Sequence, residues 1–400
     1  MNSLHNGIRR IRTMNAIHES ALALFGSHYE VGPDVEDPLA LLVRSAPIDT
    51  DKYPSILAIA RAGVGVDKIS LAKATAAGIC VINTPGTNAL SVAELVAAAV
   101  GNYYRNLDGA VAFTRSLDPE LSDEAMDKLV EEEKKRFVGS ELAGKMLGVL
   151  GLGSVGVLVA NAGIAAGMNV IGYDAAPSWR HMLRLNPAMK AAGRLEDVLR
   201  TAEIISVHVP LLPATEKMLG VRQISLMRKD TVIVNYSRKE VCDSDAILAA
   251  LDGGALRAYL TDFPQGKLNR HPKVFCTPHL GASTNESEEK SAASAVTRLQ
   301  EFLEYGVTVN SVNFPTIEDF PDPNVCTRLV IVNRDVPGMI AAVSSALGDA
   351  GINISGFKDK SNGAVGYNLV DIEAWVPEEI AQKIRDVPNV INVRVLRFEN

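Results

Sequence analysis

The chain has 400 residues, a formal net charge of -7, 47% hydrophobic residues and 22% charged residues. This length and composition predict a globular protein with more than one hydrophobic core, and they exclude the disordered and fibrous classes. The mild negative charge leaves no broad basic face, so we expect neither a nucleic-acid partner nor an attachment to anionic membranes.

Cysteine usage and the N-terminus bear on the cellular compartment. The four cysteines are far apart and form no Cys-x-x-Cys pair, which favours reduced thiols and predicts no metal site. Residues 1–12 are basic but contain neither the apolar core of a secretory signal nor a lipidation motif. We therefore expect a cytoplasmic protein. The cysteines are Cys80, Cys242, Cys276 and Cys326.

In chain order, the first apolar runs lie at 40–43, 56–59 and 79–82, separated by helical stretches and turn residues. This alternation predicts a parallel α/β sheet with both faces covered. Residues 88–108 are rich in Ala, Val and Leu and predict a long helix. The charged segment 118–137 predicts a peripheral helix that begins after Ser122.

The stretch between Lys145 and Asp174 contains no charged residue and is long enough to span a bilayer. Its seven glycines suit a buried strand, a turn, a helix and a second strand better than a membrane helix. With the apolar runs that follow, it predicts a complete doubly wound dinucleotide-binding unit. Strands are expected at 147–151, 169–174, 204–209, 231–235, 255–261 and 274–277, and helices at 195–201 and 243–251.

A helix is predicted at 286–305 and a strand at 309–314. The order of predicted strands and helices changes after them. A proline-rich linker is expected next. The order strand, helix, strand, strand, helix, strand then predicts a split ferredoxin-like module, with Asn362-Gly363 as a hairpin turn. Its elements are expected at 326–332, 337–350, 352–360, 367–374, 377–385 and 390–398.

The pattern Gly-x-Gly-x-x-Gly follows a predicted strand and opens a predicted helix, which is the context of a dinucleotide-binding fingerprint. The glycines permit a tight turn, close approach of the backbone to a pyrophosphate, and packing of helix on strand. Asp174 ends the next strand, where its carboxylate can bind ribose hydroxyls and repel a 2′-phosphate, so we expect NAD. A glycine turn without a ligand is the alternative. The candidate phosphate-binding residues are Gly151, Gly153, Ser154, Val155 and Gly156.

Arg238 and His279 each follow a predicted strand of this unit, at the edge where ligands of open α/β sheets collect. A histidine can accept or return the proton of a hydroxyl group, and an arginine offers a planar fork for a carboxylate. A histidine after a strand is also commonly structural, so both interpretations remain open at this point.

Further motifs resemble those of the D-2-hydroxyacid dehydrogenases, and among them the D-3-phosphoglycerate dehydrogenases, over nearly the whole chain. The tail from about residue 325 resembles an ACT domain. The motifs are Ala60-Arg-Ala-Gly63-Val-Gly65-Val-Asp67, Asn83-Thr-Pro85-Gly86, His208-Val-Pro210 with Thr215, Asn235 to Arg238, Thr277-Pro-His279-Leu-Gly281-Ala-Ser-Thr284, Asn333-Arg-Asp335-Val-Pro337-Gly338 and Gly351-Ile-Asn353-Ile.

The resemblance implies NAD-dependent oxidation of 3-phospho-D-glycerate to 3-phosphohydroxypyruvate, which begins serine synthesis. It implies His279 as the acid/base and Arg238 as the carboxylate anchor. It also implies a substrate-binding domain at 1–107 and 284–313, an NAD-binding domain at 108–283, a linker at 314–324 and an ACT regulatory domain at 325–400. Implied substrate-binding residues are Arg61 with the backbone at Ala62, Gly63 and Val64, and more weakly Arg44. Implied cofactor-lining residues are His208, Pro210, Thr215, Ser237, Asp262 and Gly281.

One position departs from the family, whose members carry a glutamate shortly after the Asp-x-Phe segment to orient the histidine. Here Asp262 is followed by no glutamate, and Lys267 stands near the expected place. A lysine beside His279 would oppose protonation of the imidazole. Lys267 could act as acid/base or bind substrate; it could be a solvated lysine, with His279 unassisted or helped by another carboxylate; or the enzyme could be weak.

The ACT resemblance implies serine feedback across a dimer interface, in a homodimer or homotetramer, through Asn333, Asp335 and Asn353. Asp335 is acidic where a neutral amide is often found, and a purely structural pairing module is the alternative. Two rival functions remain: a dehydrogenase for another small D-2-hydroxy acid, and a non-enzymatic NAD-sensing regulator on the same fold.

Overall fold

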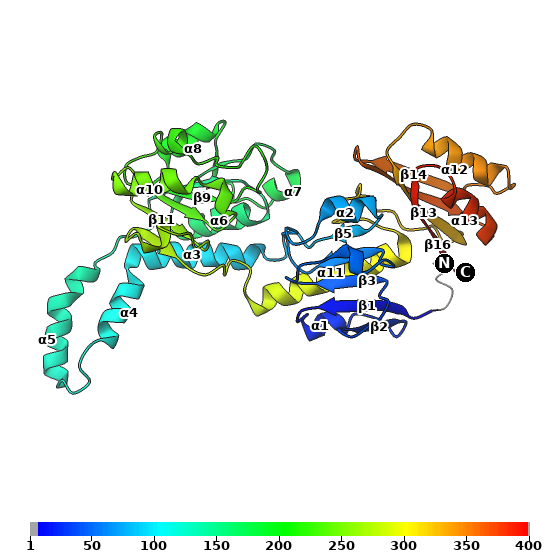
Figure 1. The fold of residues 1–400 in the computed structure, drawn as a ribbon. Coiled ribbons are helices and arrows are strands. Elements are labelled where there is room, and N and C mark those ends of the chain that lie inside the picture. The colour runs from blue at the N-terminus through cyan, green and yellow to red at the C-terminus, as the bar shows by residue number, and fades with distance from the viewer. Residues whose placement is uncertain (1–6, 399–400) are drawn as a thin grey trace. The chain divides into compact units, whose positions relative to one another are not determined.

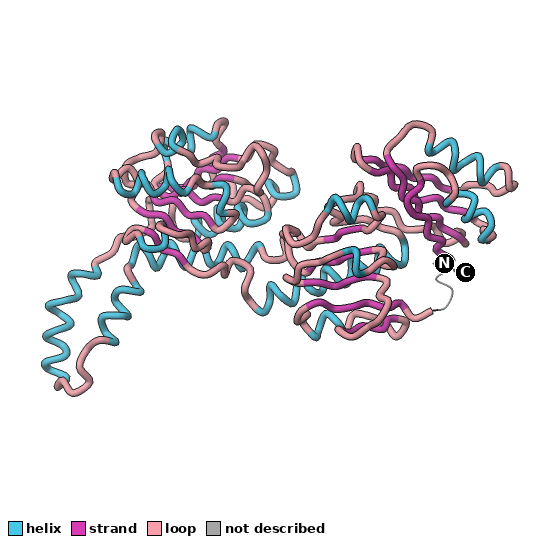
Figure 2. The backbone as a smooth tube through the Cα atoms, viewed as in Figure 1, coloured by secondary structure: helices cyan, strands magenta, loops and turns pink. Residues whose placement is uncertain are grey.

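The computed structural model describes residues 7–398 (Figures 1 and 2). Residues 1–6, part of the segment in which we looked for a signal sequence, lie outside the described residues. The chain divides into two compact units: residues up to Thr87 together with those from Asn285 on, and Asn88–Thr284.

The first unit contains a parallel sheet of order β2-β1-β3-β4-β5, which helix α11 covers on one face. The expected strands near residues 40, 56 and 79 are confirmed. Strand β1 was not predicted because arginines interrupt its apolar pattern, and β2 was not predicted either. The elements are β1 (Arg9–Met14), α1 (Glu19–Leu22), β2 (Tyr29–Gly32), β3 (Ala40–Val43), η1 (Thr50–Lys52), β4 (Ala58–Arg61), α2 (Leu71–Ala76), β5 (Cys80–Ile82) and α11 (Asn285–Tyr305).

The second unit is a doubly wound parallel sheet of order β12-β11-β10-β9-β6-β7-β8, as predicted. The uncharged stretch before Asp174 forms β6, α6 and β7, and no helix within residues 7–398 is long and apolar enough to cross a membrane. The strands are β6 (Met146–Leu150), β7 (Asn169–Tyr173), β8 (Lys190–Ala191), β9 (Ile204–Val207), β10 (Val232–Asn235), β11 (Ala258–Thr261) and β12 (Val274–Cys276). The principal helices are α3 (Ala89–Arg105), α6 (Ser154–Ala165), α7 (Trp179–Met182), α8 (Leu195–Thr201), α9 (Val221–Ile224) and α10 (Ser244–Asp252).

Helix α3 belongs to the second unit, although we expected residues up to 107 in the substrate-binding domain. Its buried residues Val92, Val96 and Val100 share a hydrophobic core with α6 and the sheet. Asn106 adopts a left-handed conformation with φ 47°, which ends α3 and starts a helix that was not predicted.

That additional helix, α4 (Leu107–Arg115), and the predicted α5 (Asp123–Glu133) form an arm that projects from the second unit (Figure 1). Neither helix has a buried residue. The hydroxyl of Ser122 caps α5 as expected, by accepting a hydrogen bond from Ala125 N at 3.3 Å. The short helix η2 (Lys134–Phe137) leads back to the sheet.

Residues from Thr327 on form an antiparallel sheet of order β14-β15-β13-β16 with two helices, which confirms the ferredoxin-like module. One face of its sheet packs under α12 and α13. The other face shares a core with the first sheet and α11 through residues such as Val330 and Tyr367, so the module belongs to the first unit. The elements are β13 (Thr327–Arg334), α12 (Met339–Gly348), β14 (Gly356–Ser361), β15 (Val365–Ile372), α13 (Glu378–Arg385) and β16 (Val390–Arg397).

Two expectations for the connection into this module were wrong. Residues 309–314 form no strand but a turn that makes a single bridge between Ile82 and Ser311, because side-chain hydrogen bonds hold the segment. Residues 314–324 are not a free linker, since Phe314 and Ile317 are buried in the core. Asp319 of this segment also pairs with the buried guanidinium of Arg328 on β13.

Candidate active site

The glycine turn between β6 and α6 has the geometry that a dinucleotide requires. Gly151 has φ +89°, and a Cβ there would lie 2.7 Å from the carbonyl oxygen of His208. A Cβ on Gly156 would lie 1.8 Å from the carbonyl oxygen of Gly151, so only glycine lets α6 pack this closely. A Cβ on Gly153 would meet nothing within 4 Å. The turn is therefore open at its middle glycine, where a pyrophosphate can approach the first-turn N–H groups of Ser154 and Val155.

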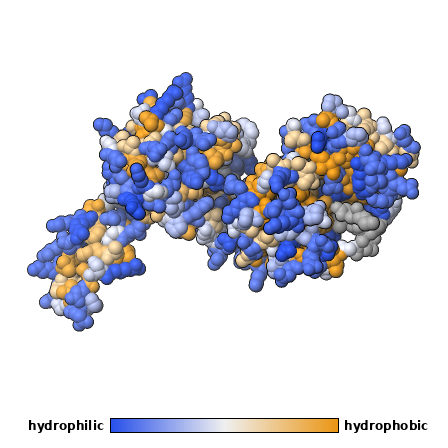
Figure 3. Space-filling model, in the orientation of Figure 1, coloured by the Kyte–Doolittle hydropathy of each residue, from blue (hydrophilic) through white to orange (hydrophobic). Residues whose placement is uncertain are grey.

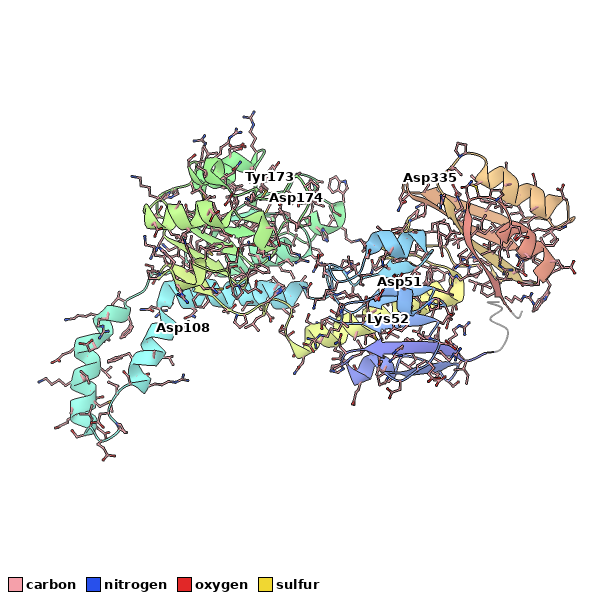
Figure 4. All side chains as sticks on the ribbon, in the orientation of Figure 1. Asp51, Lys52, Asp108, Tyr173, Asp174 and Asp335 are labelled. Carbon is pink, nitrogen blue, oxygen red and sulfur yellow. The ribbon has the colours of Figure 1, made fainter. Side chains whose placement is uncertain are left out.

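Asp174 follows β7 next to Tyr173 (Figure 4) and is tied to the glycine turn. Its Oδ2 accepts a hydrogen bond from Leu152 N at 2.7 Å, and its Oδ1 accepts one from Ala176 N at 2.8 Å. These bonds fix the carboxylate beside the turn and leave lone pairs for ribose hydroxyls.

His181 on α7 was not singled out from the sequence. Its Nε2 lies 3.2 Å from the hydroxyl of Ser154 at the start of α6, which joins α7 to the glycine turn. No sequence signal marks this histidine, because the contact links residues that are far apart along the chain.

His208 and Thr215 lie in the loop after β9. The His208 Nε2 lies 2.7 Å from the Ser206 hydroxyl, and desolvation lowers the pKa of His208 to about 3, so the imidazole is neutral at physiological pH. The Thr215 hydroxyl donates to Pro210 O at 2.5 Å and accepts from Leu212 N at 2.8 Å. The threonine therefore shapes the loop, while the ring of Pro210 is exposed.

Arg238 is held in place by the fully buried Asn235 at the end of β10. The Asn235 Nδ2 donates to Arg238 O at 2.9 Å, and its Oδ1 accepts from the Ser237 hydroxyl at 2.9 Å. The Arg238 guanidinium donates one bond, from Nη1 to Ser237 O at 2.7 Å, and is partly exposed. Its remaining donors are available for a carboxylate.

Asp262 and His279 are neighbours at the ends of β11 and β12. Asp262 is completely buried; its Oδ2 accepts a hydrogen bond from Gly281 N at 2.9 Å, and its Oδ1 has no partner among the described residues. Desolvation raises the pKa of Asp262, while the Gly281 bond and the charge of His279 act in the opposite direction. The His279 ring lies 5.0 Å from the ring of Phe263 and is exposed.

Lys267 is an exposed residue that precedes the short helix η4 (Leu268–Arg270). Its ammonium group makes no hydrogen bond or ion pair with any group in residues 7–398. The loop around it is instead held by Gln265, whose Oε1 accepts from the Ser244 hydroxyl at 2.6 Å. The structure thus provides no contact that links Lys267 to His279.

The loop after β4 was expected to bind the anionic groups of a substrate through Arg61 and backbone amides. Arg61 Nε donates to Arg44 O at 3.0 Å, and the Arg44 guanidinium is paired with Glu288. Ala62 N already donates to Val43 O, and Gly63 N donates to the Thr84 hydroxyl at 2.8 Å.

The amides of Ala62 and Gly63 are therefore not available to an anion, because the sheet and the neighbouring loop use them. The N–H of Val64, half-buried in the same loop, donates to no group in the described part of the chain. Of the implied backbone donors, Val64 is the one that this loop leaves open.

The three implied effector residues are not brought together within one chain. Asn333 is 3% exposed and accepts a hydrogen bond from Asn368 Nδ2 at 2.7 Å. Asn353 is exposed in the turn after α12, and Asp335 accepts from Gly363 N at 3.1 Å. No hydrogen bond or ion pair within residues 7–398 joins any two of the three side chains.

The doubly wound sheet, the open glycine turn and Asp174 define the second unit as a dinucleotide-binding unit of the dehydrogenase class. Residues 7–398 contain no cluster of three or more His, Cys, Asp or Glu side chains that could hold a metal ion. Residues 110–281 match the family model described as the NAD-binding domain of D-isomer specific 2-hydroxyacid dehydrogenases.

Full-length relatives extend this match. The chain is 31% identical to a D-3-phosphoglycerate dehydrogenase of Escherichia coli, over 83% of this chain and 80% of that one. It is 34% identical to a D-3-phosphoglycerate dehydrogenase of Methanocaldococcus jannaschii, over 77% of this chain but only 58% of that longer one. The chain therefore belongs to the D-2-hydroxyacid dehydrogenase family and binds NAD.

A solved structure shares the fold. The NAD+-bound 3-phosphoglycerate dehydrogenase of Entamoeba histolytica aligns with a TM-score of 0.60 and 23% identity, over 78% of this chain and 99% of that one.

Proposed function

We propose that this protein is an NAD-dependent dehydrogenase that interconverts 3-phospho-D-glycerate and 3-phosphohydroxypyruvate, the entry to phosphorylated serine synthesis. Relatives that bear this name match most of the chain. One structural observation carries the proposal: the buried Asp262 carboxylate has one oxygen bonded to Gly281 N and one oxygen without a partner, beside His279. A buried polar atom without a partner is costly, so a bound ligand is expected to donate to it.

The residues present fit NAD. The open middle glycine and the first turn of α6 suit the pyrophosphate, Asp174 suits the adenosine ribose, and Asp262 Oδ1 can accept from the carboxamide of the nicotinamide. The bound nicotinamide supplies the hydride acceptor at which the substrate carbon is oxidised.

The chain itself supplies the proton transfer and the anion binding. We assign His279 as the base that takes the proton of the substrate hydroxyl and returns it in the reverse reaction. Arg238 would hold the substrate carboxylate and polarise the carbonyl of the keto acid, since Asn235 fixes its backbone. Arg61 and the Val64 N–H suit a phosphate group.

We interpret Lys267 as a solvated lysine. It is exposed and makes no polar contact with the described residues, whereas Asp262 lies close enough to His279 for the charge of His279 to lower the pKa of Asp262 against the larger effect of burial. Asp262 is thus the carboxylate that would support His279 in the absence of the usual glutamate.

We further propose that the protein is a homodimer that pairs through the arm formed by α4 and α5. The arm buries no residue of its own helices, and hydrophobic residues lie along it between hydrophilic ones (Figure 3). Leu107 is 51% exposed and Val111 44% exposed. A second copy of the chain would cover this surface. We place the protein in the cytoplasm, where its four free cysteines would stay reduced.

The test uses purified protein, NADH and a panel of keto acids, with loss of NADH absorbance as the measurement. We expect the highest kcat/KM with 3-phosphohydroxypyruvate and much lower values with pyruvate and glyoxylate. Equal or higher values with the unphosphorylated acids would assign the protein to another hydroxy acid. If NADH binds and no keto acid is reduced, the NAD-sensing regulator is the correct function.

A further inference from the structure

Helix α7 and the residues after it lie along α6 in the second unit. Asn161 of α6 holds this segment through its side-chain amide: Nδ2 donates to Arg184 O at 2.9 Å, and Oδ1 accepts from Asn186 N at 2.8 Å. Met182 packs against the hydrophobic core that α6 shares with the sheet. These contacts hold the segment on α6 without any contribution from the side chain of His181.

The imidazole of His181 reaches from α7 to the glycine turn. Its Nε2 lies 3.2 Å from the hydroxyl of Ser154, the first residue of α6. Both residues are half-buried, and Nδ1 of His181 makes no hydrogen bond with the described residues. The Ser154 hydroxyl likewise makes no other hydrogen bond within residues 7–398. The two side chains therefore form an isolated polar pair at the turn where we expect the pyrophosphate.

The segment that carries His181 is basic. Residues 175–186, directly after Asp174, contain Arg180, His181 and Arg184 and no acidic residue. Neither arginine side chain makes a hydrogen bond or an ion pair in the part of the chain that the structure describes. The two carboxylate oxygens of Asp174 each accept a hydrogen bond from a backbone N–H. The surroundings of the polar pair thus favour an anion over a cation.

The hydrogen-bonding capacity of the pair suits an anionic ligand. A serine hydroxyl has one proton to donate and can accept two hydrogen bonds. Hydrogen bonds to a charged acceptor are the stronger ones, so an anion at the first turn of α6 draws the hydroxyl proton of Ser154 toward itself. Nε2 of His181 then carries a proton and donates to the same oxygen, and each bond in such a chain strengthens the next. The pair can therefore add one side-chain donor to the N–H groups of the turn.

We infer that His181 is a positioning residue for the cofactor: it donates to the Ser154 hydroxyl, which donates in turn to a pyrophosphate oxygen of NAD. A purely structural tie between α7 and α6 would duplicate the bonds of Asn161. The inference rests on the part of the proposed function that places the pyrophosphate at the glycine turn, and it does not depend on the identity of the substrate.

Binding of three ligands to the full chain tests the inference. NADH and ADP-ribose both contain the pyrophosphate, and ADP-ribose lacks the nicotinamide, whereas adenosine has no phosphate. We expect His181→Ala to weaken the binding of NADH and ADP-ribose by roughly fivefold or more, because the Ser154 hydroxyl loses its preferred direction. Adenosine affinity, measured by displacement of NADH, should change by less than about twofold. Unaltered far-UV circular dichroism and melting temperature show that each variant is folded.

Further variants separate positioning from packing. His181→Gln keeps a donor near the place of Nε2 and should bind NADH within about threefold of wild type. Ser154→Ala should weaken NADH binding as His181→Ala does. The double variant should bind NADH no more weakly than Ser154→Ala alone, since His181 acts through that hydroxyl. Leu183→Ala is the control, because Leu183 is 82% exposed on the same segment, and it should bind all three ligands as wild type does.

Three results overturn the inference. One is an unchanged affinity of His181→Ala for NADH and ADP-ribose. Another is an equal loss of affinity for adenosine, which would mean that the imidazole holds α7 in place and does not act on the phosphates. The third is a double variant whose loss is the product of the two single losses, because His181 would then act without Ser154.

Failure of the proposed function gives a different pattern. If Gly153→Ala leaves NADH affinity unchanged as well, the pyrophosphate does not lie at the glycine turn, and the phosphate site and this inference are rejected together. If the His181 and Ser154 variants behave as expected and no keto acid is reduced, the proposed reaction is rejected and the role of His181 in cofactor binding is supported.

Discussion

The buried carboxylate of Asp262 accepts a hydrogen bond from the backbone N–H of Gly281 at 2.9 Å. This bond ties the end of β11 to the loop that carries His279, two residues before Gly281. The position of the proposed base is thus fixed by a carboxylate on the neighbouring strand, and Lys267 has no part in this arrangement.

We predict that Lys267→Ala lowers kcat by no more than about tenfold, while His279→Ala lowers it by roughly 10²–10⁴-fold. The reason is that Lys267 is exposed and without a polar contact among the described residues, whereas His279 neighbours Asp262. Steady-state NADH oxidation at saturating keto acid measures both. A loss with Lys267→Ala as large as that with His279→Ala would show that the lysine does the acid/base chemistry.

Gly153→Ala should weaken NADH binding by roughly tenfold or more and leave the folding stability nearly unchanged. The added methyl meets nothing in the protein within 4 Å and would occupy the space that a pyrophosphate needs. Gly193→Ala is the matched control, because that position is also open and lies outside the turn. Fluorescence titration with NADH distinguishes them, and equal affinities would contradict the assigned phosphate site.

Arg61→Ala should raise KM for 3-phosphohydroxypyruvate by roughly tenfold or more, through the loss of a charged hydrogen bond to the phosphate. Arg44→Ala should change it by less than about threefold, because Glu288 already neutralises that guanidinium. The KM of both variants is also measured with pyruvate, which has no phosphate group. If Arg61→Ala affects pyruvate as strongly, the residue does not recognise phosphate.

Arg328→Met should destabilise the first unit by about 3–5 kcal/mol. Arg328 is completely buried and pairs with Asp371 at 2.6 Å and with Asp319 at 3.1 Å. Its loss leaves Asp371 without its cation and leaves Asp319 with the exposed Lys358 alone. The exposed pair of Arg228 and Asp230 offers the control, since Arg228→Met should cost less than about 1 kcal/mol. Urea unfolding measures the free energy of unfolding of both variants. Similar losses in the two variants would contradict the prediction that the buried ion pair contributes more to stability than the exposed one.

His208 should make the protein less stable toward acid. The pKa of His208 is about 3 in the folded protein and 6.5 ordinarily, so between these pH values the unfolded chain binds a proton that the folded chain does not. The contribution of His208 to the free energy of unfolding is therefore fully present above about pH 6.5 and is lost as the pH falls toward 3. His208→Gln should lose less stability between neutral and acidic pH than wild type, as measured by urea midpoints. The exposed His18→Gln should follow wild type; an unchanged slope in His208→Gln would refute the prediction.

Local signals in the sequence were sufficient for the glycine turn and for six of the seven strands in the sheet of the second unit, but not for β8 or helix α4. Gly151, Gly153, Gly156 and Asp174 lie in a short segment whose spacing reflects one strand, one turn and one helix, and the apolar runs that follow mark the remaining strands. The ferredoxin-like module was predictable for the same reason, because the turn Asn362-Gly363 separates two alternating strands.

Contacts between distant residues could not be predicted. Arginines interrupt the apolar pattern of β1, so the sequence did not indicate this strand, which pairing with β2 and β3 stabilises. Residues 314–324 resembled a linker, although Phe314 is buried and packs against Tyr367. The Asp262 oxygen without a partner and the use of the Ala62 and Gly63 amides are likewise results of tertiary structure.

Transfer of a labelled hydride tests the central claim most directly. Protein is mixed with 3-phosphohydroxypyruvate and NADH that carries deuterium at the transferable position, and the product is analysed by NMR. We predict 3-phospho-D-glycerate with deuterium at C2, formed by wild type and by Lys267→Ala, and formed by His279→Ala at a rate lower by roughly 10²-fold or more. Binding of NADH without deuterium in any hydroxy acid would contradict the assignment of this protein as a dehydrogenase.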